Sequence, residues 1–203
     1  MGKMNLLKAN WEGKVGQTVG AKWKDKSTIR TYTKPSNPDT EAQRTVRTAF
    51  GDMTAFVALF SDQIKYLSAL NTRGMSVRNA IIKANKAQID TGTFDPATLL
   101  VSKGGLPNVT GAAAAYSAGK VTVTGTKPVA TNISDQAQFV AVVADKTGKR
   151  GFANVADLGD TPSVEVDTGT LEAGEYDVYA YILDKRGSSK VGSNSVHLTV
   201  TVA

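Results

Sequence analysis

One stretch of the chain carries hydrophobic residues at a single helical period. In residues 40–70 they recur at alternating steps of four and three, which places them on one stripe of an α-helix. The stripe consists of Val46, Phe50, Met53, Val57, Phe60, Ile64 and Leu67. Thr40 and Gln43 have the spacing of a capping box, so we expect one helix over the whole stretch, beginning at Thr40.

A helix of roughly 30 residues is a rod of about 45 Å, and its apolar stripe must be covered. Two alternatives remain open. The stripe faces the core of its own chain, or it packs against another chain, because steps of four and three also describe a coiled-coil seam. A second helix is expected after Ser76, which can cap it, with Val77, Ala80 and Ile81 on one face. The two helices predict an αα-hairpin over residues 39–96.

Beyond residues 104–107 the hydrophobic period changes from helical to the two-residue alternation of β-strands. Apolar runs separated by turn residues cover residues 120–124, 136–145, 152–155, 163–167, 175–184 and 195–202. With residues 109–112 or a short strand at 97–101, about seven strands are expected. This count is typical of an immunoglobulin or fibronectin type III sandwich, predicted here over residues 97–203. Tyr176 stands where such domains form a tyrosine corner.

Residues 1–38 are basic, rich in glycine and only weakly hydrophobic. An alternation from Val15 to Trp23, a turn at Asp25 and Lys26, and residues 27–32 together predict a β-hairpin, with flexible turns as the alternative. Pro35 and Pro38 predict a rigid hinge before the long helix. The whole chain is therefore expected to be an α+β protein. Its parts are a basic N-terminal arm with a β-hairpin, an αα-hairpin and a C-terminal immunoglobulin-like sandwich.

Composition narrows the possible functions. The chain of 203 residues has 0 Cys and 1 His, which excludes disulfides and leaves zinc without its usual ligands. No apolar run is long enough to span a bilayer, and no signal peptide is recognised at the N-terminus, so we expect a protein made and kept inside a cell, without membrane contact.

Positive charge is concentrated in the first half of the chain. Residues 1–103 hold 16 Lys and Arg against 8 Asp and Glu, and residues 104–203 hold 8 against 10. The basic half can meet nucleic acid or an acidic protein surface.

Candidate catalytic motifs are weak. The glycines at 13, 16 and 20 do not have the spacing of a phosphate-binding loop. His197 lies in an alternating run without a nucleophile motif, so a hydrogen-bonded or solvent-facing histidine is expected. The acidic residues between 157 and 167 lack the spacing of a calcium loop, which favours a solvated loop. We therefore predict no catalytic, cofactor or metal-binding residue. An enzyme such as a glycosidase is the weakest alternative, and it would need two carboxylates about 5 to 10 Å apart in a cleft.

A basic and aromatic cluster in the first half predicts partner binding. Interleaved cations and aromatic rings suit a phosphate backbone with stacked bases, and they suit an acidic protein equally. The partner-binding residues are expected to be Trp11, Trp23, Lys22, Lys24, Arg30, Arg44, Arg47 and Phe50.

Several of these motifs resemble an uncharacterised family of bacterial and phage-borne proteins that is known only as a domain of unknown function. The matching positions are Gly13 with Gly16, Trp23 with Lys24, Ile29 with Arg30, residues 35–43 (PSNPDTEAQ), Arg47 with Phe50, Asn79 with Asn85, and residues 102–106 (SKGGL). Similar genes occur in gut-type bacteria and their tailed phages, and the resemblance implies no active site.

This context implies a non-enzymatic virion protein of the capsid or tail, made in the host cytoplasm. Such a protein would assemble with copies of itself and other virion proteins through its N-terminal arm and helices, and would display the immunoglobulin-like module. The alternative is a nucleic-acid-binding or packaged protein that uses the basic patch from Lys22 to Arg47.

Overall fold

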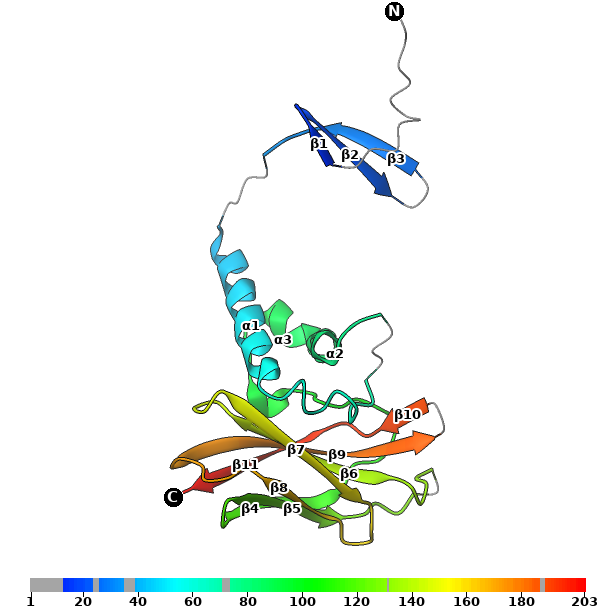
Figure 1. Ribbon diagram of the computed structural model, residues 1–203, viewed down its shortest axis with the longest axis vertical. Helices are drawn as coiled ribbons and strands as arrows, with labels where there is room; N and C mark the ends of the chain where they lie inside the picture. The colour runs from blue at the N-terminus through cyan, green and yellow to red at the C-terminus, as the bar shows by residue number, and fades with distance from the viewer. Residues whose placement is uncertain (1–12, 24–25, 35–38, 71–73, 131, 187–188) are drawn as a thin grey trace, which may run out of the picture. The chain divides into compact units, whose positions relative to one another are not determined.

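The computed structural model describes residues 13–23, 26–34, 39–70, 74–130, 132–186 and 189–203 (Figure 1). The chain divides into two compact units, Met1–Asp39 and Thr40–Ala203. Four parts of the N-terminal prediction lie outside the described residues: Trp11, Lys24, Asp25 of the predicted turn, and the hinge over residues 35–38.

The N-terminal unit holds a three-stranded antiparallel sheet of β1 (Gly13–Val15), β2 (Thr18–Trp23) and β3 (Lys26–Thr31). The predicted antiparallel pairing is present between β2 and β3, because Trp23 lies opposite Lys26 and Thr18 lies opposite Thr31. The prediction of one continuous first strand is wrong. Gly16 has a φ of 59°, which glycine adopts without strain, and the chain reverses there between β1 and β2.

The long helix begins as predicted but ends early. Helix α1 spans Glu41–Ala58, and the Thr40 hydroxyl accepts a hydrogen bond from the Gln43 N–H at 3.4 Å. The predicted continuation to residue 70 is wrong, since irregular turns follow Leu59. Gly151 of the β-sheet packs so closely that a Cβ there would lie 2.5 Å from the Leu59 carbonyl oxygen. Phe60 is fully buried in these turns, so its burial does not require a continued helix.

The second predicted helix is present in two pieces, α2 (Val77–Ala84) and α3 (Lys86–Thr91). The Ser76 cap is confirmed, because its hydroxyl accepts from the Asn79 N–H at 3.2 Å. The strand expected at residues 97–101 is wrong. A short 3₁₀-helix, η1 (Pro96–Thr98), stands there, since the Asp95 carboxylate caps the Ala97 N–H at 2.9 Å and proline suits a first helical turn.

The C-terminal region forms two antiparallel sheets from eight strands among the described residues. They are β4 (Thr110–Ser117), β5 (Lys120–Thr126), β6 (Gln138–Asp145), β7 (Arg150–Asp157), β8 (Ser163–Asp167), β9 (Gly174–Arg186), β10 (Ser189–Gly192) and β11 (Val196–Val202). One sheet has the order β4-β5-β8, and the other has the order β10-β9-β6-β7 with β11 also paired to β9. The hydrophobic pattern did not predict β10, and it predicted only the first residues of β4.

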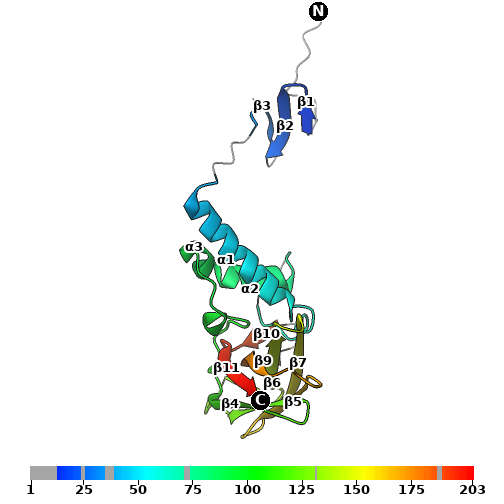
Figure 2. The same cartoon turned by 90° about the vertical axis from the view of Figure 1, so that its left-hand side faces the viewer.

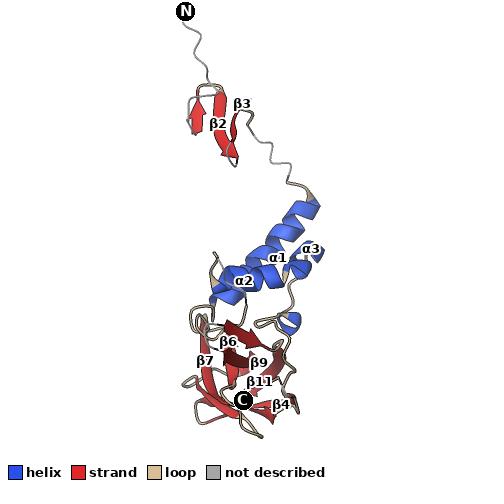
Figure 3. Cartoon of the chain, turned by 90° about the vertical axis from the view of Figure 1, so that its right-hand side faces the viewer, coloured by secondary structure: helices blue, strands red, loops and turns tan. Residues whose placement is uncertain are grey.

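Alternating side chains of β6 and β9 enter two different cores. Phe139 and Val178 point into the core between the two sheets, which also holds Val121. Val142 and Tyr179 point from the opposite face into a second core, shared with the helices. Figures 2 and 3 show the helices on that side of the sheets. The second core is therefore shared by the predicted helical domain and the predicted β domain. Within the described parts of the chain, no helix has the length and apolarity needed to cross a membrane.

Candidate functional site

The predicted partner-binding residues fall in both units. Lys22 and Trp23 belong to β2, and Arg30 lies exposed in β3. The other three, Arg44, Arg47 and Phe50, are exposed together on the first turns of α1. The structure therefore places two cations and one aromatic ring on the exposed surface at the start of α1, within one unit. It also gives Arg30 a set of neighbours that the sequence did not indicate.

A basic row crosses the N-terminal sheet. Lys14 lies opposite Val19, and Val19 lies opposite Arg30, so the three side chains share one face. The Lys14 Nζ stands 3.7 Å from the centre of the Tyr32 ring, within the range of a cation–π contact. Tyr32 is 42% exposed. The row therefore presents positive charge beside an accessible aromatic ring. Lys14 is far from Arg30 in sequence, and the pairing of the three strands brings the two residues onto the same face.

The hydrophobic stripe of α1 changes from exposed to buried along the helix. Met53 and Val57 are fully buried against the rest of the chain, whereas Val46 is 39% and Phe50 is 48% exposed. The first alternative, a stripe that faces the core of its own chain, therefore holds for the second half of the stripe, and packing of the first half against another chain stays a prediction. Its second half faces the core of its own chain, and its first half presents apolar surface to solvent.

A groove of about 410 Å³ lies beside the exposed half of the stripe. Phe50, Ile82 and Ile89 provide its apolar surface, from α1, α2 and α3 respectively. Lys86 and Asp90 form an ion pair along α3 at its rim. The exposed ring of Phe50 therefore adjoins a hollow apolar surface.

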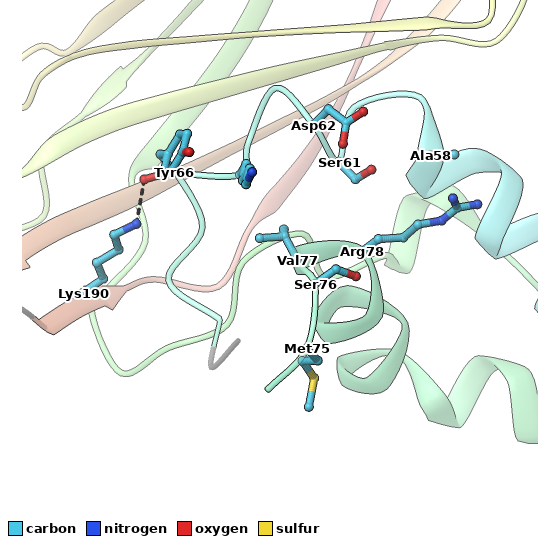
Figure 4. A pocket seen from close by; sticks show the side chains of 10 residues that line it. Ala58, Ser61, Asp62, Tyr66, Met75, Ser76, Val77, Arg78 and Lys190 are labelled. Atoms are coloured by element: carbon cyan, nitrogen blue, oxygen red, sulfur yellow. Dashed lines mark hydrogen bonds between the residues drawn. The ribbon is translucent and has the colours of Figure 1, made fainter. Parts of the chain in front are cut away.

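A second hollow, of about 610 Å³, lies between the turns after α1 and the start of α2 (Figure 4). Two of its three cations, Arg78 and Lys190, bind backbone groups of the same chain, and the Lys65 Nζ lies 5.5 Å from the centre of the Tyr66 ring. The Lys190 Nζ donates to the Tyr66 carbonyl oxygen at 2.8 Å, and the Arg78 Nη2 donates to the Thr54 carbonyl oxygen at 2.8 Å. The first bond ties β10 to the segment that follows α1, and the second ties α2 to α1 itself, so we assign this hollow a structural role.

The single histidine is hydrogen bonded, as expected. His197 Nε2 lies 2.8 Å from Asp177 Oδ1, and Lys146 Nζ lies 2.7 Å from the other oxygen of that carboxylate. The three groups form one polar cluster at the surface of the larger sheet. Among the described residues there is no group of three or more His, Asp or Glu that could hold a metal ion.

Comparison with known proteins places most of the chain in one family. A family model described as "Family of unknown function (DUF6266)" matches residues 9–198. No curated protein matches the sequence.

Proposed function

Because this chain belongs to the DUF6266 family of unknown function, we propose its role from its own residues and from the resemblance described above: it is a non-enzymatic structural protein of a phage particle. It is associated with the capsid or the tail, assembles through its N-terminal arm and helices, and displays an immunoglobulin-like domain outward. Its partners are copies of itself and other virion proteins.

The observation that supports assembly best is the exposed half of the α1 stripe. Val46 and Phe50 continue the spacing of Met53 and Val57, so a second α1 can pack along the same seam and cover them. Burial of each such side chain contributes about 1.5 to 3 kcal/mol. The adjoining groove at Ile82 and Ile89 extends the apolar contact.

Two observations support the immunoglobulin-like module. One sheet has the order β4-β5-β8, and in the other β9 pairs with both β6 and β11, which supports their assignment to strands A-B-E and C-F-G of such a sandwich. The Tyr176 hydroxyl also donates to the Glu172 carbonyl oxygen at 2.9 Å, which is the hydrogen bond of a tyrosine corner.

Light scattering during size-exclusion chromatography tests the assembly. We expect the full chain to form a homo-oligomer whose mass falls toward that of the monomer in Phe50→Ser. The control Thr48→Ser, on the opposite face of α1, should keep the wild-type mass. A wild-type chain that stays monomeric at all concentrations contradicts assembly through α1.

Mass spectrometry of purified particles tests the virion role. Cells that carry the gene and release phage should yield particles that contain this protein at a constant ratio to the major capsid protein. Its absence from particles, with the protein present in the same lysate, contradicts the proposal.

The basic row on the N-terminal sheet supports the alternative of a nucleic-acid-binding protein. Lys14, Arg30 and the accessible Tyr32 ring combine cations with a stacking surface. Binding to single-stranded DNA should then weaken by orders of magnitude between 50 and 200 mM salt, and Arg30→Gln should reduce it further. Lys103→Gln, in the other unit, is the matched control. Oligomerisation through apolar surface should persist over the same salt range.

A further inference from the structure

A cleft of about 650 Å³ lies between α1, the loop before η1 and the turn that joins β6 to β7. Its apolar lining residues are Ala55, Phe56, Leu59, Phe94 and Pro96, and two lysines and one aspartate complete its lining. Its volume is within the usual range for small-molecule sites, which combine an apolar lining with a few polar groups.

The aromatic floor of the cleft is held in place by the protein core. The Phe56 and Phe94 rings lie 5.4 Å apart between centroids, and Phe56 also packs edge-on to Tyr179 at 6.3 Å. The Tyr179 hydroxyl donates to the Pro96 carbonyl oxygen at 2.8 Å, which fixes the loop that carries Phe94. The aromatic floor is therefore already formed in the absence of a ligand.

The turn that carries the two lysines is also fixed. Asp145 is buried, and its carboxylate accepts from the Gly148 N–H at 2.8 Å and from the Arg150 Nε at 2.9 Å. Position 148 requires glycine, since a Cβ there would lie 2.3 Å from the Asp145 carboxylate. Lys149 follows in the left-handed region, with a φ of 51°. The turn therefore sets the direction in which Lys149 leaves the backbone.

The two lysines differ in their partners. Lys146 pairs with Asp177, whose other oxygen contacts His197, so its charge is already compensated. Lys149 is exposed and forms no ion pair within the described parts of the chain. Asp52 on α1 lines the same cleft and places a negative charge there. The cation available to a ligand is therefore Lys149.

We propose that this cleft binds a small aromatic carboxylate, with its ring on Phe94 and Leu59, which Phe56 supports from beneath, and its carboxylate on the Lys149 ammonium. Edge-on and tilted ring contacts suit an aromatic body better than a flexible chain of the same area. A carboxylate accepts charge-assisted hydrogen bonds from an ammonium, and the fixed turn reduces the entropy lost on binding. The site does not depend on the assembly role proposed above.

Naphthalene-1-acetate is a suitable probe, and naphthalene-1-ethanol is its neutral counterpart. The acid is titrated into the protein, and the amide chemical shifts are followed by NMR. The acid should shift the amide signals of α1, residues 94–96 and the β6–β7 turn. The alcohol should bind at least about fivefold more weakly, because it lacks the charge. Equal affinity of the two compounds, shifts elsewhere, or no binding at millimolar acid would overturn the proposal.

Variants of the two opposite charges provide a second test. Lys149→Asn removes the cation and retains a residue that tolerates the left-handed backbone, and it should weaken binding of the acid about tenfold. Asp52→Asn should tighten it roughly two- to fivefold by removing a repulsion. Lys103→Asn, outside the cleft, should leave affinity unchanged. Thermal unfolding of each variant verifies folding, and wild-type affinity in a folded Lys149→Asn chain would overturn the assignment.

Discussion

Asn85 and Leu100 are joined by two hydrogen bonds between one side chain and one backbone unit. The Asn85 Nδ2 donates to the Leu100 carbonyl oxygen at 2.9 Å, and the Asn85 Oδ1 accepts from the Leu100 N–H at 2.8 Å. The same Nδ2 donates to the Ile81 carbonyl oxygen at 2.8 Å. Asn85 is only 4% exposed, so it connects the end of α2, the start of α3 and the loop after η1 inside the protein.

Asn85→Ala should therefore lower the free energy of unfolding by about 3 kcal/mol, because it leaves the backbone groups of Leu100 without a partner in a buried place. Urea unfolding measures the change. Asn79→Ala, at an exposed position of α2, should change stability by less than about 0.5 kcal/mol. Equal effects of the two substitutions would contradict the role assigned to Asn85.

The Tyr176 hydroxyl should stabilise the loop before β9 through its bond to Glu172. Tyr176→Phe removes this bond, keeps the buried ring and should cost about 1 kcal/mol in urea unfolding. Tyr66→Phe is the matched control, since Tyr66 is 71% exposed. A Tyr176→Phe chain as stable as the control would show that the bond contributes nothing to folding.

The turn between β4 and β5 contains a strained residue. Ala118 has a φ of 50° and precedes Gly119, whose φ is 80°, as in the two-residue hairpin turns that favour Asn-Gly or Gly-Gly. Ala118→Gly should raise the melting temperature, with a gain of about 1 kcal/mol. The same substitution at Ala115, an exposed position within β4, should lower stability by about 0.5 to 1 kcal/mol. Changes of the same sign at both positions would contradict this account.

Two buried tyrosines should make the protein sensitive to alkaline pH. Burial raises the pKa of Tyr181 and of Tyr179 well above the usual value of 10.0, and nearby Asp177 adds to the rise for Tyr179. In the unfolded chain each phenol loses its proton near pH 10. Their contribution to stability is thus complete below pH 10 and declines as pH rises toward the pKa of the folded state.

Urea unfolding between pH 9 and 11 measures this decline. Above pH 10 each tyrosine should contribute a slope of up to about 1.4 kcal/mol per pH unit, and Tyr181→Phe should make the decline less steep. Tyr66→Phe, at an exposed position, should leave the slope as it is in the wild type. An unchanged slope in Tyr181→Phe would contradict the assignment.

Local patterns in the sequence determined the starts of α1 and α2 and most of the strands. Thr40 and Ser76 cap the helices where they were expected, because a cap depends on residues only three positions apart. Two-residue alternation located β5, β8 and β11, and the motif around Tyr176 pointed to a local role for this tyrosine, whose hydroxyl donates to the Glu172 carbonyl oxygen. Such features are readable from the chain alone, since their partners are neighbours in sequence.

Tertiary packing decided where α1 ends, which half of its stripe is covered and how the aromatic cleft is built. Gly151 is more than 90 positions from Leu59, yet its close approach lies where the helix ends. Phe56, Phe94 and Lys149 come from three separate segments. Periodicity records which side of an element is apolar, but burial depends on contacts between distant segments, and only the folded chain brings those segments together.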